Sequence, residues 1–278
     1  MKRHLTGLAG ALVLAPALAA PLLVIDLQGQ VARPSRPPLA LLDELQAGER
    51  IDLPVGARLT LVDLADGREY RLTGGAQAQV APTGLTNAQG QTLAAQVTSA
   101  RTLPMLALKQ GQAAPATLVM RDPRAEGLPA LREPVRTLVL DTRPSFRWDA
   151  IVGARRYQLQ LTQPDGHVVW ETETRAPQAT LPPELRLREG SDYGWRVIAW
   201  GLTDPQWESS ARFAVADAAL RDRLAEQRAL AGDDFGARLF LATQLDAVGA
   251  RAEAQALWQV LARERPENAV LKARAAAH

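Results

Sequence analysis

The spacing of apolar residues changes near Asp217, and this change constrains what each part of the chain can fold into. Before Asp217, apolar and polar residues alternate over short runs, as in Tyr157–Leu161. After it, apolar residues recur every three or four positions, as in Phe235–Leu245. Alternation is typical of strands with one buried face, whereas the longer spacing is typical of helices. We therefore predict a multidomain, mainly β chain that ends in α-helices.

The N-terminus has the three parts of a secretory signal peptide. A basic stretch at residues 2–4 precedes an apolar run from Leu5 to Leu18, and small residues follow at Ala19 and Ala20. The apolar run is shorter than the roughly 20 residues that a transmembrane helix needs. We therefore expect residues 1–20 to be removed and the mature protein to be periplasmic and not membrane-spanning. No cysteine follows the cleavage site, which excludes a lipoprotein.

The residue types that catalysis and metal binding commonly need are scarce. The chain has no cysteine, and only His167 and His278 follow the signal peptide. A zinc site of cysteine and histidine is therefore excluded, and a nucleophilic triad lacks its usual base. No Gly-x-Ser-x-Gly sequence and no phosphate-binding Gly-rich loop is present. We expect no enzyme activity, no cofactor and no metal.

Paired carboxylates leave one catalytic alternative open, because two acids at the right separation suffice for a glycosidase. Glu171 and Glu173 form one candidate pair, and Asp233 and Asp234 form another. Both pairs also have structural explanations. The first is expected on one face of a hairpin strand, and the second just before a helix, where acids cap free N–H groups.

The charge of the mature chain argues against a nucleic-acid partner. The full chain has 32 basic and 30 acidic residues and a pI of about 9.3. Two of the basic residues, Lys2 and Arg3, belong to the signal peptide, so the mature chain has equal numbers of both kinds. The two kinds are interleaved, so no basic stripe for a polyanion is expected.

Residues 21–96 are predicted to form a small β domain. Leu22–Leu27 has the apolar content of a strand, and Arg33–Pro38, with three prolines, is expected to be a loop. Leu59–Leu64 and Glu69–Thr73 flank Asp66-Gly67, a pair that favours a hairpin turn because glycine tolerates a positive φ. Short strands at this spacing are typical of a barrel or sandwich.

This block resembles the periplasmic part of FecR-like domains. The similarity rests on Gly48-Glu49-Arg50-Ile51, on Gly56-Ala57-Arg58-Leu59-Thr60-Leu61, and on the Asp66-Gly67 turn before Tyr70–Leu72. FecR proteins that regulate sigma factors carry a cytoplasmic segment and a membrane helix before this domain, and here a signal peptide replaces both. The resemblance therefore implies a periplasmic sensor or signalling accessory, without sigma-factor control.

Residues 97–129 are predicted to be a connector. Pro104, Pro115, Pro123 and Pro129 interrupt the segment, and only Ala116–Arg121 has the pattern of a strand. We expect this strand to join the edge of a neighbouring sheet.

Residues 130–216 show the pattern of a two-sheet sandwich, with alternation at Tyr157–Leu161 and again at Tyr193–Ala199. The spacing Leu187-x-x-Gly190-x-x-Tyr193 and the placement of Trp148 make the segment similar to fibronectin type III and related immunoglobulin-like domains. The resemblance implies that Trp148 is buried and that the phenol of Tyr193 bonds to the backbone at the turn between two strands. Alternation places four residues on the core face: Tyr193, Trp195, Val197 and Ala199.

Residues 217–278 are predicted to form helices. Phe235–Asn268 resembles one tetratricopeptide repeat of about 34 residues. Its small residues fall at Ala242 and Ala254, and its large aromatic and terminal proline fall at Trp258 and Pro266. Only one full repeat is visible, preceded by a helix that amounts to half a repeat, and such units need about three neighbours to bury their faces. The hairpin is therefore expected to pack on the sandwich, pair with another chain or receive a partner helix.

Five residues are candidates for contact with a partner. Alternation places Trp200 on the opposite face of the strand from the core-facing Trp195. Trp207 follows Gly201 in a segment expected to be a loop. Loops at one end of such a sandwich commonly form binding surfaces. The alternative is that these two rings only cover the sandwich edge. The helical hairpin contributes the other candidates: Phe235, Leu239 and Trp258.

These observations predict a non-enzymatic, exported envelope protein that acts as a protein-interaction or scaffold/adaptor module. Its partner is expected to be another envelope protein. Two alternatives stay open. The first is the periplasmic sensor or signalling accessory, and the second is a cell-wall polysaccharide-binding protein that uses Trp200 and Trp207.

Overall fold

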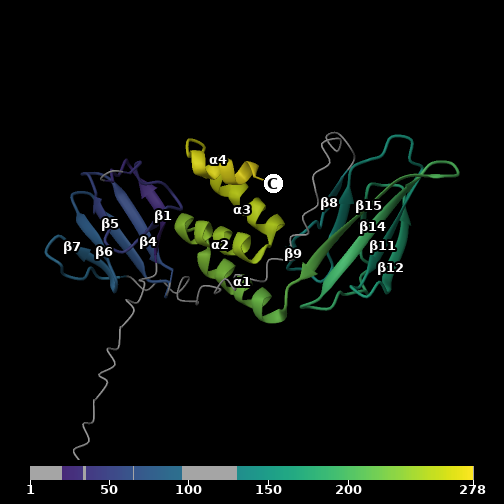
Figure 1. Ribbon diagram of the computed structural model, residues 1–278, viewed down its shortest axis with the longest axis horizontal. Helices are drawn as coiled ribbons and strands as arrows, with labels where there is room; N and C mark the ends of the chain where they lie inside the picture. The colour runs from purple at the N-terminus through teal and green to yellow at the C-terminus, as the bar shows by residue number, and fades with distance from the viewer. Residues whose placement is uncertain (1–20, 34–35, 65, 96–129, 278) are drawn as a thin grey trace, which may run out of the picture. The chain divides into compact units, whose positions relative to one another are not determined.

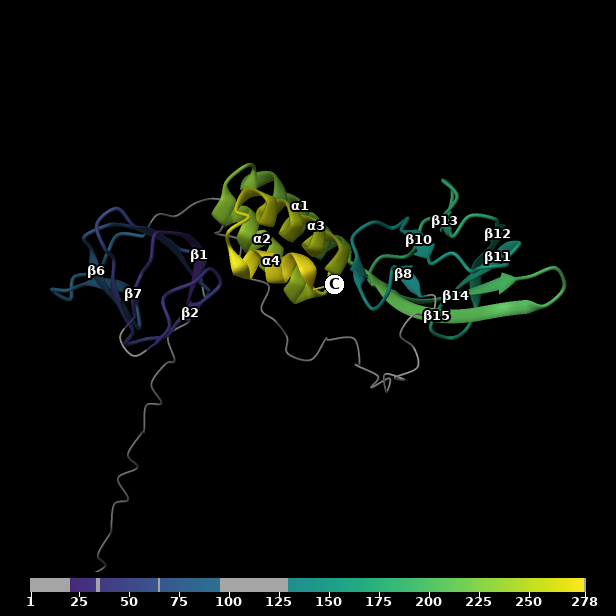
Figure 2. The same ribbon diagram turned by 90° about the horizontal axis from the view of Figure 1, so that it is seen from above.

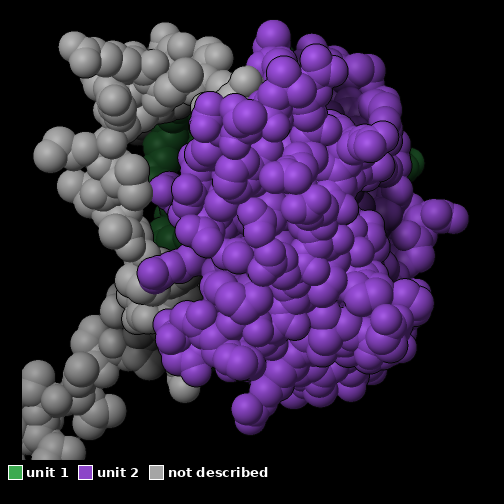
Figure 3. All heavy atoms as spheres, turned by 90° about the vertical axis from the view of Figure 1, so that its right-hand side faces the viewer, with its two compact units in different colours: residues 1–97 green, residues 98–278 purple. Residues whose placement is uncertain are grey.

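The computed structural model describes residues 21–33, 36–64, 66–95 and 130–277 (Figure 1). The chain divides into two compact units, Met1–Val97 and Thr98–His278, which Figure 3 colours separately. The predicted signal peptide and the whole predicted connector, with its strand at 116–121, lie outside the described residues.

Unit 1 contains two antiparallel sheets. The larger has the strand order β2-β1-β4-β5, and the smaller has the order β3-β6-β7. Apolar side chains of β1 and β4 are buried, among them Val24, Ile25 and Leu61. The described part of this unit is all β, as predicted. Its strands are β1 Leu22–Gln28, β2 Glu44–Leu45, β3 Arg50–Asp52, β4 Arg58–Asp63, β5 Glu69–Thr73, β6 Gln77–Ala81 and β7 Gly84–Asn87.

The predicted hairpin turn joins β4 to β5. Gly67 has a φ of 76°, and its N–H donates to the carbonyl of Asp63 at 2.9 Å. The carboxylate of Asp66 accepts from the N–H of Arg68 at 3.0 Å. Glycine suits this position because the missing side chain permits a positive φ.

The N-terminal part of unit 2 is a sandwich of two sheets. One has the strand order β13-β10-β8, and the other has the order β12-β11-β14-β15-β9. β14 and β15 run side by side as a long antiparallel ribbon (Figure 2), and β9 pairs with β15 in parallel. The strands are β8 Leu131–Glu133, β9 Leu138–Val139, β10 Ser145–Trp148, β11 Arg156–Thr162, β12 Val168–Thr174, β13 Gln178–Thr180, β14 Asp192–Trp200 and β15 Pro205–Val215.

The inner faces of the two sheets enclose an aromatic core. Trp148 is buried as predicted, and its ring lies edge-on to Tyr157 with 5.4 Å between the ring centroids. The indole N–H of Trp195 donates to the carbonyl of Pro134 at 2.7 Å, so the polar atom of this large ring is satisfied inside the core. All four residues that were predicted to face inward on β14 are buried: Tyr193, Trp195, Val197 and Ala199.

The predicted tyrosine corner is confirmed. The N–H of Arg188 donates to the phenol oxygen of Tyr193 at 2.9 Å. Leu187, in the same loop, is buried in the sandwich core. The bond therefore ties the loop between β13 and β14 to the strand that follows it.

Helices form the described C-terminal part of unit 2. Asp217 and Asp234 cap α1 and α2, and each carboxylate accepts from the N–H three residues later. Gly249 ends α2 in the left-handed conformation with a φ of 81°, and α3 ends shortly before the predicted terminator Pro266. The helices are α1 Ala218–Ala231, α2 Phe235–Val248, α3 Arg251–Glu264 and α4 Ala269–Ala276.

The helices pack on the sandwich through the turn between α2 and α3. The carbonyl of Gly249 accepts from the N–H of Leu138 at 2.9 Å and from the hydroxyl of Thr137 at 3.0 Å. The same hydroxyl accepts from the N–H of Arg251 at 3.1 Å. Among the helices, α1 packs on α2 and α4 packs on α3. The α2–α3 turn is therefore bonded to the sandwich, whereas the faces of the hairpin helices are covered mainly by α1 and α4 and not by the sandwich as one expectation had it.

Replacing Tyr193 with phenylalanine should lower the free energy of unfolding of unit 2 by about 1–2 kcal/mol, because the N–H of Arg188 loses its partner. All six tryptophans lie in unit 2, so tryptophan fluorescence during urea unfolding reports on this unit. Tyr70→Phe, in unit 1, is the control and should leave that transition unchanged. An unchanged midpoint for Tyr193→Phe would contradict the role of the corner.

Thr137→Val should loosen the junction between helices and sandwich, because valine keeps the shape of the side chain and lacks the hydroxyl. We expect faster amide hydrogen exchange at Leu138 and Arg251, and a loss of about 1–2 kcal/mol in unfolding free energy. The exposed Thr180→Val on β13 is the matched control. Equal exchange rates in Thr137→Val and the wild type would show that the hydroxyl does not hold the junction.

Candidate interaction surface

The predictions of Leu239 and Trp258 as contact residues are wrong, because both side chains are fully buried among the helices. The indole N–H of Trp258 donates to the carboxylate of Asp246 at 2.8 Å, and the guanidinium carbon of Arg274 lies 5.8 Å from the centre of its ring. The physical reason is that α1 and α4 supply the neighbours that a lone hairpin lacks. These residues form the core of the helices.

Phe235, the first residue of α2, is partly buried. The guanidinium carbon of Arg265 lies 3.4 Å from the centre of its ring. A cation over an aromatic face is a favourable contact. One face of the Phe235 ring is therefore covered by the chain itself.

Trp207 lies within strand β15, so its prediction as a loop residue is wrong. It pairs with the inward-facing Ala199 and packs against the edge of the sandwich core. The strand begins early because the connection from β14 is short and closed by a bond from the N–H of Gly201 to the carbonyl of Asp204, at 2.9 Å. Trp207 therefore belongs to the core side of its sheet.

Trp200 lies on the other face of the same sheet. It pairs with Arg156 across the strands, and the guanidinium carbon of Arg156 lies 5.2 Å from the centre of the indole ring. The side chain is partly buried. Trp200 and Trp207 consequently do not form one pair of exposed rings.

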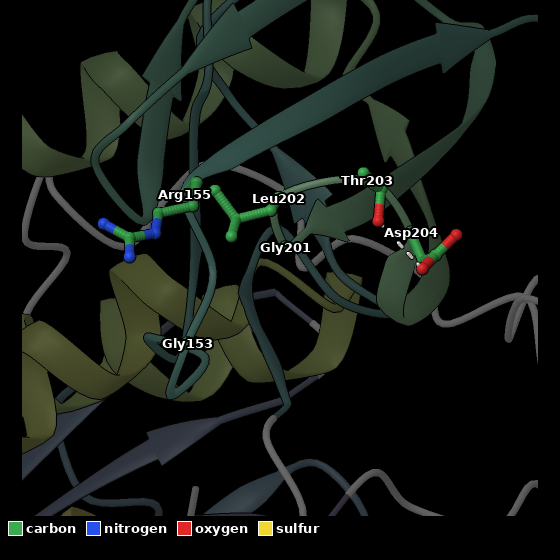
Figure 4. A pocket seen from close by; sticks show the side chains of 6 residues that line it. All are labelled: Gly153, Arg155, Gly201, Leu202, Thr203 and Asp204. Atoms are coloured by element: carbon green, nitrogen blue, oxygen red, sulfur yellow. Dashed lines mark hydrogen bonds between the residues drawn. The ribbon is translucent and has the colours of Figure 1, made fainter.

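The most exposed large apolar side chains described in unit 2 lie at one end of the sandwich. Val152 is 99% exposed in the loop 149–155, and Leu202 is 88% exposed in the loop 201–204. A shallow depression of about 330 Å³ lies between these loops (Figure 4). It is lined by Gly153, Arg155, Gly201, Leu202, Thr203 and Asp204.

A third loop, 175–177, reaches the same end of the sandwich. Thr174 at the end of β12 pairs with Tyr157 at the start of β11, and the carbonyl of Pro177 accepts from the N–H of Trp148. We call the surface formed by loops 149–155, 175–177 and 201–204 the loop end.

The loop end could be found from the sequence only in part. The tryptophans pointed toward it, whereas its aliphatic residues were missed. Val152 precedes Gly153, and Leu202 follows Gly201. The glycines mark these turns, but nothing in the sequence pattern shows that the aliphatic neighbours are exposed.

Ion pairs neutralise part of the charge at the loop end. Arg132 donates two hydrogen bonds to the carboxylate of Asp149, at 2.7 and 2.8 Å. These bonds, together with one from the N–H of Ala130, hold the pKa of Asp149 below its ordinary value. Arg155 and Arg175 are exposed, and among the described residues their side chains have no hydrogen-bond or ion-pair partner.

The acids considered for catalysis have structural partners. Glu171 accepts hydrogen bonds from the amides of Gln158 and Gln160 on the outer face of the sheet, and these bonds lower its pKa. Asp234 is the cap of α2 and accepts from the N–H of Ala237 at 2.7 Å. Both arrangements match the structural explanations expected from the sequence.

The described residues offer neither a metal site nor a membrane-spanning helix. No group of three or more histidine, cysteine, aspartate or glutamate side chains is placed to hold a metal ion in this part of the chain. No helix within the described ranges is long and apolar enough to cross a membrane.

Comparison with known proteins gives similarity to solved structures alone. No protein-family model matches the chain, and no curated protein matches it. A crystal structure named FN3tt is 17% identical, with 29% of this chain and 85% of that chain covered and a TM-score of 0.25.

Two further structures have similar values. The fibronectin type III domain of human collagen alpha-1(XX) is 18% identical, with coverage of 32% and 83% and a TM-score of 0.27. An Fn3-like protein from Clostridium thermocellum is 15% identical, with coverage of 32% and 95% and a TM-score of 0.22. The neighbours are thus fibronectin type III-like domains, and similarity at this level supports no argument about function.

Arg132→Gln should raise the pKa of Asp149 toward its ordinary value. A carboxyl whose folded pKa is lowered stabilises the fold above its unfolded pKa, and this stabilisation disappears as pH falls through the folded pKa. Wild type and Arg132→Gln should therefore differ in stability at neutral pH and converge in acid. Carboxyl-carbon NMR titration of Asp149 measures the pKa, and the exposed Arg186→Gln is the control. An unchanged titration in Arg132→Gln would refute the pairing.

Proposed function

We propose that this chain is a non-enzymatic, exported interaction or scaffold module that binds a protein partner through its loop end. The observation that carries the proposal is the near-complete exposure of Val152 and Leu202 at the tips of adjacent loops. The removal of aliphatic side chains from water by a partner lowers the free energy of the complex. Exposed apolar groups that gather at one place commonly mark interaction sites.

Hydrogen bonds hold the backbone of the loop end, which lowers the entropy lost on binding. The phenol of Tyr157 accepts from the N–H of Ile151 at 2.9 Å. The carbonyl of Trp200 accepts from the N–H of Arg155 at 2.7 Å. A surface that is already ordered supports a role in recognition.

The helices join the sandwich at its opposite end. β9 pairs with Ala214 and Val215 at the end of β15, whereas the loop 201–204 precedes the start of that strand. Glu189 and Arg221 form an ion pair at the same junction. The helices therefore leave the loop end uncovered, as a scaffold with one docking surface requires.

The finer parts of the proposal concern the other modules. We assign unit 1 as FecR-like on its sequence pattern and on the hairpin between β4 and β5. We assign the helices as tetratricopeptide-like on the hairpin of α2 and α3 and its turn at Gly249. In this proposal residues 1–20 direct the chain to the periplasm.

A cell-wall glycan is the weaker candidate for the partner. Stacking on a sugar needs an open aromatic face. Arg156 covers one face of Trp200, and Trp207 packs against the core on the other side of the sheet. Geometry of this kind favours a protein partner.

Val152→Asp combined with Leu202→Asp should reduce recovery of the partner from envelope extract by about tenfold or more, because the apolar contact is lost. The full mature chain serves as bait, and partners are identified by mass spectrometry. Val55→Asp is the matched control, since Val55 is 92% exposed at a turn of unit 1. Equal recovery by the loop variant and the control would overturn the proposed function.

A further inference from the structure

The loop end carries positive charge that the chain does not neutralise. Two acids at or next to this surface, Asp149 and Glu173, lie beside arginines, with nitrogen-to-oxygen distances of 2.7 and 4.0 Å. The third, Asp204, accepts a hydrogen bond from the hydroxyl of Thr203. Arg155 and Arg175 have no side-chain partner within the described ranges. Two arginines without a partner therefore stand against one carboxylate without a cationic partner, Asp204, so the charge left for a partner is net positive.

The free positive charge and the exposed apolar surface lie together. In Figure 4 the side chain of Leu202 points toward Arg155, whereas Thr203 and Asp204 turn to the other side of the loop. The carboxylate of Asp204 accepts from the hydroxyl of Thr203 at 3.0 Å. Leu202 and Arg155 line the same depression, so a partner that covers Leu202 also contacts the side chain of Arg155.

From this arrangement, and resting on the proposed function, we infer that the loop end binds an acidic segment of a partner protein. An aliphatic or aromatic side chain of that segment packs against Val152 and Leu202. Its carboxylates pair with Arg155 and Arg175. Exposed ion pairs add little free energy one by one, but they select the sign of the partner and speed its approach.

A lipid surface fits this site less well than a protein segment. The depression between the two loops is concave, so it accommodates a projecting side chain, which a bilayer does not present.

The test begins with a phage-displayed library of random dodecapeptides selected on the full mature chain. We expect the selected peptides to be enriched in aspartate and glutamate around one aliphatic or aromatic residue. A synthetic copy of the most frequent peptide is then titrated by fluorescence anisotropy. Its binding should weaken as salt concentration rises, because salt screens exposed charges.

Arg155→Glu should raise the Kd of the acidic peptide by about tenfold, which corresponds to 1.4 kcal/mol. Arg58→Glu is the matched control, because Arg58 is an exposed arginine of unit 1 without a side-chain partner among the described residues. The control should leave the Kd unchanged. Far-UV circular dichroism checks that both variants are folded.

The outcomes separate this inference from the proposed function. If Leu202→Asp abolishes peptide binding but Arg155→Glu does not weaken it, or if the selected peptides are not acidic, the acidic partner is refuted and the docking surface remains. If neither variant affects binding, both proposals fail. Binding that depends on Leu202 to vesicles of phosphatidylglycerol and phosphatidylethanolamine, or self-association in light scattering that Leu202→Asp removes, would also overturn the acidic protein partner.

Discussion

The buried indole of Trp195 is the contact on which the sandwich of unit 2 depends. It lies on β14, and the centre of its ring is 5.2 Å from that of Phe146 and 6.3 Å from that of Trp148. Both of these rings belong to the opposite sheet. Its N–H donates to the carbonyl of Pro134, in the segment between β8 and β9. One buried side chain therefore contacts both sheets and the segment that links β8 to β9.

A rigid sandwich gives its two ends different roles. At one end, Thr137 and Leu138 hold the carbonyl of Gly249, so the helical hairpin is anchored by the turn that defines it. At the other end, short loops present Val152 and Leu202 to solvent. The separation of an anchored end from an exposed end is the feature on which the proposed docking role rests.

The secondary structure of unit 2 was largely predictable, because it follows from local patterns. Alternation on β14 identified its buried residues, and the spacing of Leu187, Gly190 and Tyr193 identified the tyrosine corner. The candidate site was not predictable to the same degree. Trp207 and Trp258 were expected to contact a partner, and both pack inside the chain's own structure. A large aromatic residue has the same sequence signal whether a partner or its own fold covers it.

The sequence by itself determined where strands give way to helices, where the turns fall and which chemistry is absent for want of cysteine and histidine. These properties depend on residue type and on spacing along the chain. Only the tertiary structure decided that α1 and α4 cover the hairpin and that Trp200 and Trp207 lie on different faces. It also decided that Leu202 and Arg155 line one depression. Contacts between residues far apart in sequence depend on register and packing, which periodicity does not specify. The exposed loop end is therefore a property of the fold.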